Sequence, residues 1–217
     1  MAVPVLIIGK SGSGKSCSLR NLDPKNVAMV NVLGKPLPFK GAGFKQMVTD
    51  DYDKVNRAIS GSVRPIIVVD DAGYLMTNMF MKGHSNAGAG NGVFTLYNNI
   101  GDRFWTMIDN IRQLPNNKRV YIMMHEEQND FGSVRPKTIG KMIDEKVCLE
   151  GMFTICLRCA VKGGKHVFLT QSDGMDVAKT PIGLFSTDEI DNDLALVDKA
   201  ICEYYEIGGN QNDSAAQ

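Results

Sequence analysis

The sequence predicts an α/β fold with a mostly parallel sheet, helices on both of its faces and a β-hairpin near the C-terminal end. Three observations lead to this fold class. A glycine-rich phosphate-binding motif, residues 9–16, follows an apolar run at the N-terminus. A second apolar run ends in two carboxylates, Asp70 and Asp71. Short apolar runs alternate with segments of helical periodicity, which is typical of parallel sheets whose strands are joined by helices.

The composition allows a proper core and narrows the function classes. Of the 217 residues, 43% are apolar. Lysine plus arginine and aspartate plus glutamate both number 24, and a net charge of zero argues against a broadly basic protein that coats nucleic acid. The sequence lacks both an apolar run of about 18 residues and the basic segment of a signal peptide. We expect a cytoplasmic protein with one domain over residues 1–207 and a disordered tail over 208–217.

The N-terminal motif matches the P-loop pattern G-x-x-x-x-G-K-[ST] over residues 9–16. Gly12 and Gly14 allow backbone turns that other residues avoid, so successive N–H groups can face phosphate oxygens. Lys15 is expected to place its charge on the β- and γ-phosphates of ATP, and Ser16 to offer its hydroxyl to Mg²⁺. The residues predicted to contact the nucleotide are Gly9, Ser11, Gly12, Ser13, Gly14, Lys15, Ser16 and Cys17.

The surroundings of this motif favour a phosphate site over a glycine- and serine-rich turn that matches by chance. Residues 3–8 are apolar, as expected for a buried parallel strand. Residues 16–22 can form a helix whose N-terminus would face the phosphates. Because a lysine in such a loop is not expected in the core, replacing Lys15 should hardly change stability.

The second half of the predicted site follows the apolar strand at residues 64–69. In P-loop proteins a strand beside the motif ends in an aspartate that holds Mg²⁺, and Asp70 fits this role. Asp71 stands where many such ATPases carry a glutamate that polarises the attacking water, so it is a candidate base with a side chain one methylene shorter. The alternative is that these aspartates cap a helix after a buried strand.

A third polar group follows the strand at residues 119–124. His125 would lie at the carboxyl end of this strand, where open α/β sheets place their ligands. In ATPases of the additional-strand type, a polar residue here senses the γ-phosphate. The alternative is a histidine that only marks the end of a strand. Glu126 is the next candidate base after Asp71.

The remaining segments complete the predicted order of elements. Two cysteines spaced C-x-x-C, Cys156 and Cys159, fall on opposite faces of a predicted strand and are expected to be core residues without a metal or redox role. The other predicted elements are a strand at 27–33, a loop at 34–41, a helix at 50–60, a glycine-rich loop at 83–92, a helix from 101 to 115, a hairpin at 153–170 that turns at 162–165, a loop at 171–185 and a helix at 192–205.

These motifs together resemble a family of small phage ATPases with a RecA-like core. Members occur in phage recombination gene clusters, and some are grouped with the ATP-dependent single-strand annealing proteins. The resemblance covers most of residues 3–206. The segments that carry it are Gly9 to Ser16, Gly34-Lys35-Pro36-Leu37-Pro38-Phe39, Asp70-Asp71, His125, Lys179-Thr180-Pro181 and the helix that opens with Asn192-Asp193-Leu194.

The resemblance implies a RecA-like P-loop fold, ATP and Mg²⁺ as ligands, self-association into a ring or filament, and single-stranded DNA as a partner. RecA-like enzymes often carry a catalytic glutamate at the end of the second strand, whereas this strand offers Asn31 and then Gly34. The base is therefore Asp71, Glu126 or an unidentified group, or hydrolysis is slow.

A neutral chain needs a local basic cluster to hold DNA. The candidates Arg135, Lys137 and Lys141 follow the strand of His125, where the loop of RecA-like folds faces the DNA axis. A second group, Lys162, Lys165 and Lys179, could reach a neighbouring subunit's nucleotide. The alternative is that all six are ordinary surface charges.

The sequence therefore predicts a Mg²⁺-dependent ATPase that acts in DNA recombination or replication. Two other functions stay open. One is a small-molecule phosphotransferase, although the glycine-rich segment contains no arginine of the kind that kinase lids use. The other is a nucleotide-gated interaction module without turnover.

Overall fold

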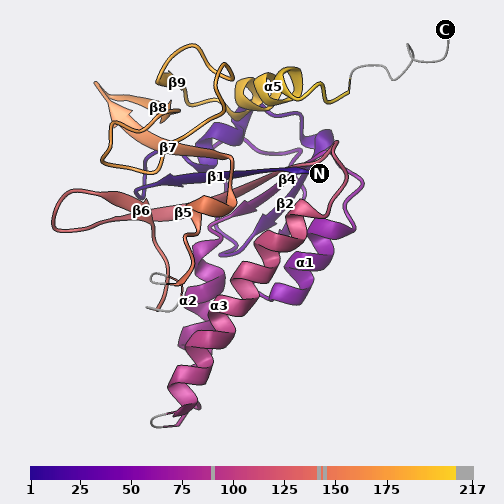
Figure 1. Cartoon of the computed structure of the whole chain (residues 1–217). Helices are drawn as coiled ribbons and strands as arrows, with labels where there is room; N and C mark the ends of the chain where they lie inside the picture. The colour runs from indigo at the N-terminus through magenta and orange to yellow at the C-terminus, as the bar shows by residue number, and fades with distance from the viewer. Residues whose placement is uncertain (89–90, 141–142, 144–145, 209–217) are drawn as a thin grey trace, which may run out of the picture.

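The computed structural model describes residues 1–88, 91–140, 143 and 146–208, and these form a nine-stranded sheet flanked by helices (Figure 1). The strand order is β3-β2-β4-β5-β1-β7-β8-β9, and β6 pairs with β5 outside this path. The strands are β1 (Val3–Gly9), β2 (Val27–Asn31), β3 (Gln46–Val48), β4 (Ile66–Asp70), β5 (Arg119–Gln128), β6 (Val134–Pro136), β7 (Ile155–Lys162), β8 (Lys165–Leu169) and β9 (Glu189–Asp191).

The pairing from β3 to β7 is parallel throughout, whereas β8, β9 and β6 join the sheet antiparallel. The mostly parallel α/β fold predicted from the sequence is thus confirmed. β7 and β8 turn at Gly163 and Gly164, which have φ angles of +55° and +78°. Glycine adopts such angles without steric cost.

Helices cover both faces of the sheet. In Figure 1, α1, α2 and α3 lie on one face, and α5 lies on the other. The side chains of β1 alternate between the two cores: Leu6 and Ile8 pack on the side of α1 to α3, and Val5 and Ile7 on the side of α5. The helices are α1 (Tyr52–Ser60), α2 (Gly73–Gly83), α3 (Asn91–Arg112) and α5 (Leu194–Tyr204), with 3₁₀ turns η1 (Ser16–Asn21), η2 (Pro24–Asn26) and η3 (Glu150–Met152).

A buried ion pair fastens α5 to the sheet. Arg119 in β5 donates from Nε and Nη2 to the two carboxylate oxygens of Asp198 in α5, at 2.9 and 2.8 Å. The hydroxyl of Tyr121, also in β5, donates to Asp198 at 2.6 Å. The N-terminal end of α5 is tied to η1, because Arg20 donates to the carbonyl of Asn192 at 2.6 Å. Helix α5 therefore supports the turn that follows the P-loop.

Several predicted boundaries are wrong. The segment after the P-loop is a 3₁₀ helix, η1, and α3 begins at Asn91 and not at residue 101, so the glycine-rich segment separates α2 from α3. β5 continues past residue 124 to Gln128 because β6 pairs with its end. The sequence did not predict α2 or the short strands β3, β6 and β9. Residues 89–90 of the glycine-rich segment and 209–217 of the predicted tail lie outside the described residues.

No helix in the described ranges is long and apolar enough to cross a membrane.

Candidate functional site

The P-loop, residues 9–16, joins β1 to η1 at the carboxyl edge of the sheet, and all three of its glycines are needed for conformation or packing. A Cβ on Gly9 would lie 2.9 Å from the carbonyl oxygen of Cys159. Gly12 and Gly14 have φ angles of +78° and +107°. A Cβ on Gly14 would also lie 3.0 Å from Oδ1 of Asn192 and 3.1 Å from Nδ1 of His166. The loop is therefore held against β8 and the start of α5 by close backbone contact.

The side chain of Lys15 folds back onto the backbone of the P-loop. Its ammonium donates to the carbonyls of Gly9 at 2.7 Å and Lys10 at 2.9 Å, and the residue is only 6% exposed. Lys15 is thus buried but belongs to neither hydrophobic core, and the small effect expected for its replacement on stability stays a prediction. Burial lowers the pKa of Lys15, and the nearby carboxylates of Asp71 and Asp70 counteract part of this effect.

Asp70 lies at the end of β4, beside the first residue of η1. Burial raises the pKa of the Asp70 carboxyl, and the hydroxyl of Ser16, which donates to it, counteracts the shift. The backbone N–H of Asp71 donates to the same carboxylate at 3.1 Å.

The pair of Asp70 and Ser16 fits Mg²⁺. A buried carboxylate and a hydroxyl in contact are the oxygen ligands that Mg²⁺ takes when phosphates and water complete its shell. Within the described ranges there is no cluster of three or more His, Cys, Asp or Glu side chains that could hold a metal by itself.

Asp71 sits next to the phosphate site in a left-handed conformation, with φ of +58°. Its Oδ2 lies 2.6 Å from the ammonium of Lys35, and its Oδ1 lies 3.5 Å from Nε2 of His125. The N-terminus of α2 is capped at Ala72 without a side-chain hydrogen bond, so Asp71 does not serve as a side-chain cap there. Its carboxylate instead faces two cationic or polar partners at the site.

His125 is paired with Gly9 in the register of β5 and β1, which places it beside the P-loop. It lies within β5 and not after it, because the strand continues to Gln128. Burial, followed by the charge of Lys15, lowers the pKa of His125. The ring meets Tyr74 of α2 edge to face, with centroids 5.9 Å apart. His125 is therefore a neutral imidazole at neutral pH, able to donate one hydrogen bond.

Glu126, the second candidate base, is engaged elsewhere. Arg158 of β7 donates from Nε to Oε2 at 2.9 Å and from Nη2 to Oε1 at 3.1 Å. The remaining nitrogen of Arg158 binds Asp176 at 3.1 Å. Because both oxygens of Glu126 accept bonds from a guanidinium, the geometry argues against its predicted role as base.

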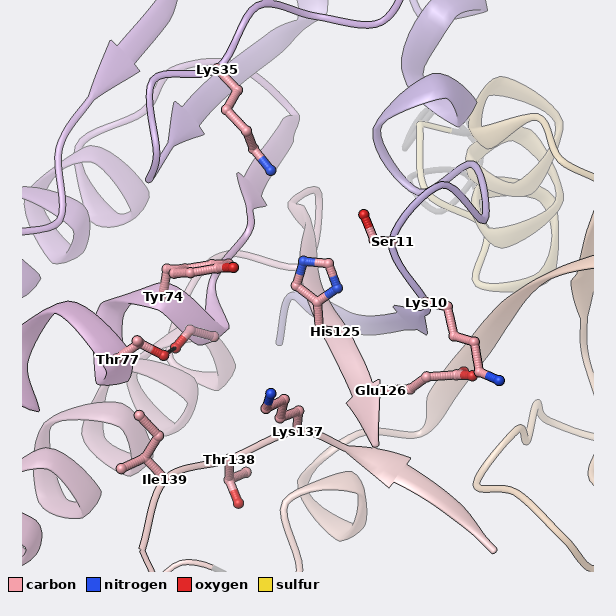
Figure 2. A pocket seen from close by; sticks show the side chains of 11 residues that line it. Lys10, Ser11, Lys35, Tyr74, Thr77, His125, Glu126, Lys137, Thr138 and Ile139 are labelled. Atoms are coloured by element: carbon pink, nitrogen blue, oxygen red, sulfur yellow. Dashed lines mark hydrogen bonds between the residues drawn. The ribbon is translucent and has the colours of Figure 1, made fainter. Parts of the chain in front are cut away.

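Two adjoining cavities lie over these residues. The smaller, of about 300 Å³, lies over the P-loop and is lined by Ser11, Gly12, Gly14, Lys15, Ser16, Cys17, Lys35, Pro38, Asp71, His125 and His166. The larger, of about 570 Å³, is lined by Lys10, Ser11, Lys35, Gly73, Tyr74, Thr77, His125, Glu126, Lys137, Thr138 and Ile139. Figure 2 shows the larger one, with Lys35 reaching in from one side, Ser11 and Lys10 on the other, and His125 between them.

Three residues of the smaller cavity were not predicted from the sequence as site residues. Lys35 and Pro38 come from the loop after β2, and His166 comes from β8, where its Nδ1 lies 2.9 Å from the carbonyl oxygen of Ser13. Lys35 belongs to a segment that supported the family resemblance, but nothing in its spacing indicated a contact with Asp71. His166 is distant in sequence from the P-loop, and only the packing of β8 over that loop brings them together.

The predicted basic residues that the structure describes lie in different surroundings. Arg135 pairs with Glu127 at 2.7 Å, Lys137 lines the larger cavity, and Lys141 lies outside the described residues. Of the second group, Lys162 pairs with Glu189 at 2.9 Å. Lys179 forms a backbone bridge with Cys156, and Lys165 is exposed at the hairpin turn.

The two C-x-x-C cysteines are buried in different cores, as their spacing predicted. Cys156 packs on the side of α1 to α3, and Cys159 on the side of α5. Both are free thiols. Burial raises the pKa of each thiol to about 12, so neither is a reactive thiolate.

A family model described as an AAA domain matches residues 1–182. The chain belongs to the AAA domain family. The match contains the P-loop, Asp70, Asp71 and His125, and it supports a nucleotide-binding P-loop ATPase; β9 and α5 of this AAA domain chain lie beyond it. No curated protein matches the chain.

Proposed function

We propose that this AAA domain protein is a Mg²⁺-dependent ATPase of phage type, active in the cytoplasm of the infected host. In this proposal it assembles into a ring or filament on single-stranded DNA and acts in recombination or replication. The observation that carries the ATPase part is the convergence of three strands at one edge. β1 leads into Lys15 and Ser16, β4 ends in Asp70 and leads into Asp71, and β5 brings His125.

Each of these groups has a defined task in phosphoryl transfer to water. Lys15 exchanges its two backbone carbonyls for phosphate oxygens, which carry a full negative charge and compete well for an ammonium. Ser16 and Asp70 would hold Mg²⁺, which would neutralise charge on the phosphates of the nucleotide. Asp71 accepts the proton of the attacking water, and neutral His125 donates a hydrogen bond to the γ-phosphate.

The DNA part of the proposal rests on the family resemblance and on the position of Lys137. This side chain is exposed and lines the larger cavity, next to His125. A phosphate contact there would lie close to the γ-phosphate sensor, and repetition of weak contacts along an assembly would add up to useful affinity.

A phosphotransferase is the second candidate function, because the larger cavity opens next to the site expected for the γ-phosphate. Its wall carries the hydroxyls of Tyr74 and Thr77 together with Lys10 and Lys137, which could hold an anionic acceptor. An interaction module without turnover is the third. The ion pair between Lys35 and Asp71 favours it, since it occupies the candidate base.

One assay separates these functions. ATP turnover is measured with Mg²⁺, with and without single-stranded DNA, and the labelled γ-phosphate is traced. Phosphate release that DNA stimulates supports the proposal. A rate of phosphate release that is the same with and without DNA refutes the proposed action on DNA. Transfer of the γ-phosphate to an added acceptor indicates a phosphotransferase. Nucleotide binding without turnover indicates the interaction module. Lys15→Ala is the control for activity from contaminating enzymes.

A further inference from the structure

The loop after β2 is built to hold Lys35 at one place. Asn31, which is 2% exposed, donates from Nδ2 to the carbonyl of Lys35 and to Oε1 of Gln46, both at 2.7 Å. Its Oδ1 accepts from the N–H of Gly34 at 2.8 Å. Gly34 has φ of +66°, and a Cβ there would lie 2.9 Å from Cγ1 of Val48. A buried amide with three partners thus fixes the backbone from which the Lys35 side chain extends.

The side chain of Lys35 extends from this backbone to the carboxylate of Asp71. The ammonium lies 2.6 Å from Oδ2, and the lysine side chain is 58% exposed while the carboxylate is 5% exposed. Burial lowers the pKa of Lys35, but the hydrogen bond and charge of Asp71 outweigh this effect and raise it above the ordinary value. Lys35 is therefore an exposed cation whose ammonium pairs with a buried carboxylate.

This contact conflicts with the action of Asp71 as a base. Oδ2 is covered by an ammonium at 2.6 Å, and Oδ1 faces His125 at 3.5 Å. An oxygen that already accepts a short bond from an ammonium is not free to accept a hydrogen bond from the attacking water. Water cannot be activated at Oδ2 until Lys35 moves away.

The same ammonium is within reach of the phosphate side of the site. Lys35 lines both cavities, and it shares the smaller one with Ser11, Lys15, Ser16 and Asp71. In Figure 2 its side chain points toward the space between His125 and Ser11. A γ-phosphate placed there carries more charge than one carboxylate and offers several acceptor oxygens.

We propose that Lys35 binds the γ-phosphate and that its transfer from Asp71 to this phosphate frees the base only when a triphosphate is bound. This inference rests on the proposed ATPase function. It assigns a phosphate-binding role to Lys35 and explains how an aspartate paired with lysine can still act in turnover. A diphosphate lacks the group that attracts Lys35, so the pair with Asp71 persists in the product state.

The test compares the affinities of four proteins for two nucleotides. Dissociation constants for ADP and for a non-hydrolysable ATP analogue, both with Mg²⁺, are measured for the wild type, Lys35→Met, Lys35→Arg and Lys40→Met. Lys40 is an exposed lysine of the same loop that lines neither cavity, so Lys40→Met is the matched control. Thermal unfolding checks that each variant is folded.

We expect Lys35→Met to weaken binding of the ATP analogue by about 10- to 100-fold, the loss typical of a hydrogen bond to a charged group, and to leave the ADP affinity within about 2-fold. Lys35→Arg should keep most of the discrimination between the two nucleotides, and Lys40→Met should match the wild type. Equal losses for both nucleotides, or no loss for either, would overturn the proposal.

Failure of the proposed function gives a different result. A wild type that binds the analogue but releases no phosphate from ATP refutes the ATPase, while the ratio of the two affinities still decides whether Lys35 contacts the γ-phosphate. A wild type that turns over ATP normally, with an affinity ratio unchanged in Lys35→Met, refutes the role of Lys35 alone.

Discussion

Two buried aspartates lie in opposite electrostatic surroundings, and replacing each by asparagine should change stability in opposite directions. Asp70 is 5% exposed and Asp198 is 8% exposed. Asp198 has a full counter-charge in Arg119. Asp70 accepts from Ser16 and from the N–H of Asp71, but it also faces the negative charge of Asp71, which the more weakly acting positive charge of Lys15 offsets only in part. Burial raises the pKa of Asp70, which means that its ionised form is destabilised in the folded protein.

The expected changes in the free energy of unfolding follow from the partners of each carboxylate. Burying a carboxylate destabilises the folded protein by several kcal/mol. Each of the two hydrogen bonds to it offsets about 1.5–3 kcal/mol of this loss. Asparagine can keep both bonds of Asp70, because Oδ1 accepts from the backbone N–H and Nδ2 donates to Ser16. We expect Asp70→Asn to stabilise the nucleotide-free protein by about 1–2 kcal/mol, a rise in Tm of about 2–8 °C. Asp198→Asn leaves Arg119 buried without a counter-charge and should cost about 3–5 kcal/mol.

The assay is thermal unfolding in chelator without nucleotide, over a range of pH. Because the pKa of Asp70 is higher in the folded state, the wild type loses stability as pH rises above the ordinary aspartate pKa of about 3.9. The gain in stability of Asp70→Asn over the wild type should therefore be complete at neutral pH and vanish near pH 4. Mg²⁺ with ATP should stabilise the wild type and not this variant. A variant destabilised as strongly as Asp198→Asn would refute the reasoning.

Three further variants test the other roles. Lys15→Ala should weaken triphosphate binding by at least about 100-fold and abolish turnover, since two or more charge-assisted bonds are lost; unchanged affinity in a folded variant, measured by titration, would refute the P-loop role. Asp71→Asn should keep nucleotide binding and slow phosphate release by about 10²- to 10⁴-fold; a normal rate would exclude Asp71 as the base. Lys137→Ala with Lys141→Ala should weaken binding to single-stranded DNA and flatten its salt dependence while basal turnover survives; wild-type binding throughout a salt titration would refute the basic-loop hypothesis.

The sequence predicted those parts of the site that depend on local pattern. The P-loop is a contiguous motif, and Asp70 and Asp71 end a strand whose apolar run is unmistakable. Parallel strands deliver their carboxyl ends to one edge, so the nearness of Asp71 to the P-loop follows once the fold class is known. The alternation rule also placed Cys156 and Cys159 on opposite faces.

The missed features depend on contacts between distant segments. Lys35 meets Asp71 only because β2 and β4 are neighbours in the sheet, and His166 meets Ser13 only because β8 folds over the P-loop. No local spacing encodes either contact. The early start of α3 was hidden by the glycines before it, which lower helix propensity while tertiary packing against α2 stabilises the helix.

The backbone of Asp71 gives an independent argument that its carboxylate is placed for function. A non-glycine residue in the left-handed region costs roughly 1–2 kcal/mol, although aspartate tolerates it better than most residues. Such strain persists where the surrounding structure enforces it, and it concentrates at functional sites. Here the φ of +58° comes directly after β4 and turns the side chain toward Lys35 and His125, while Ala72 takes the cap position of α2. A residue that served only to end the strand and begin the helix would need neither the strained angle nor the two partners, so the conformation favours a role for this carboxylate at the phosphate site.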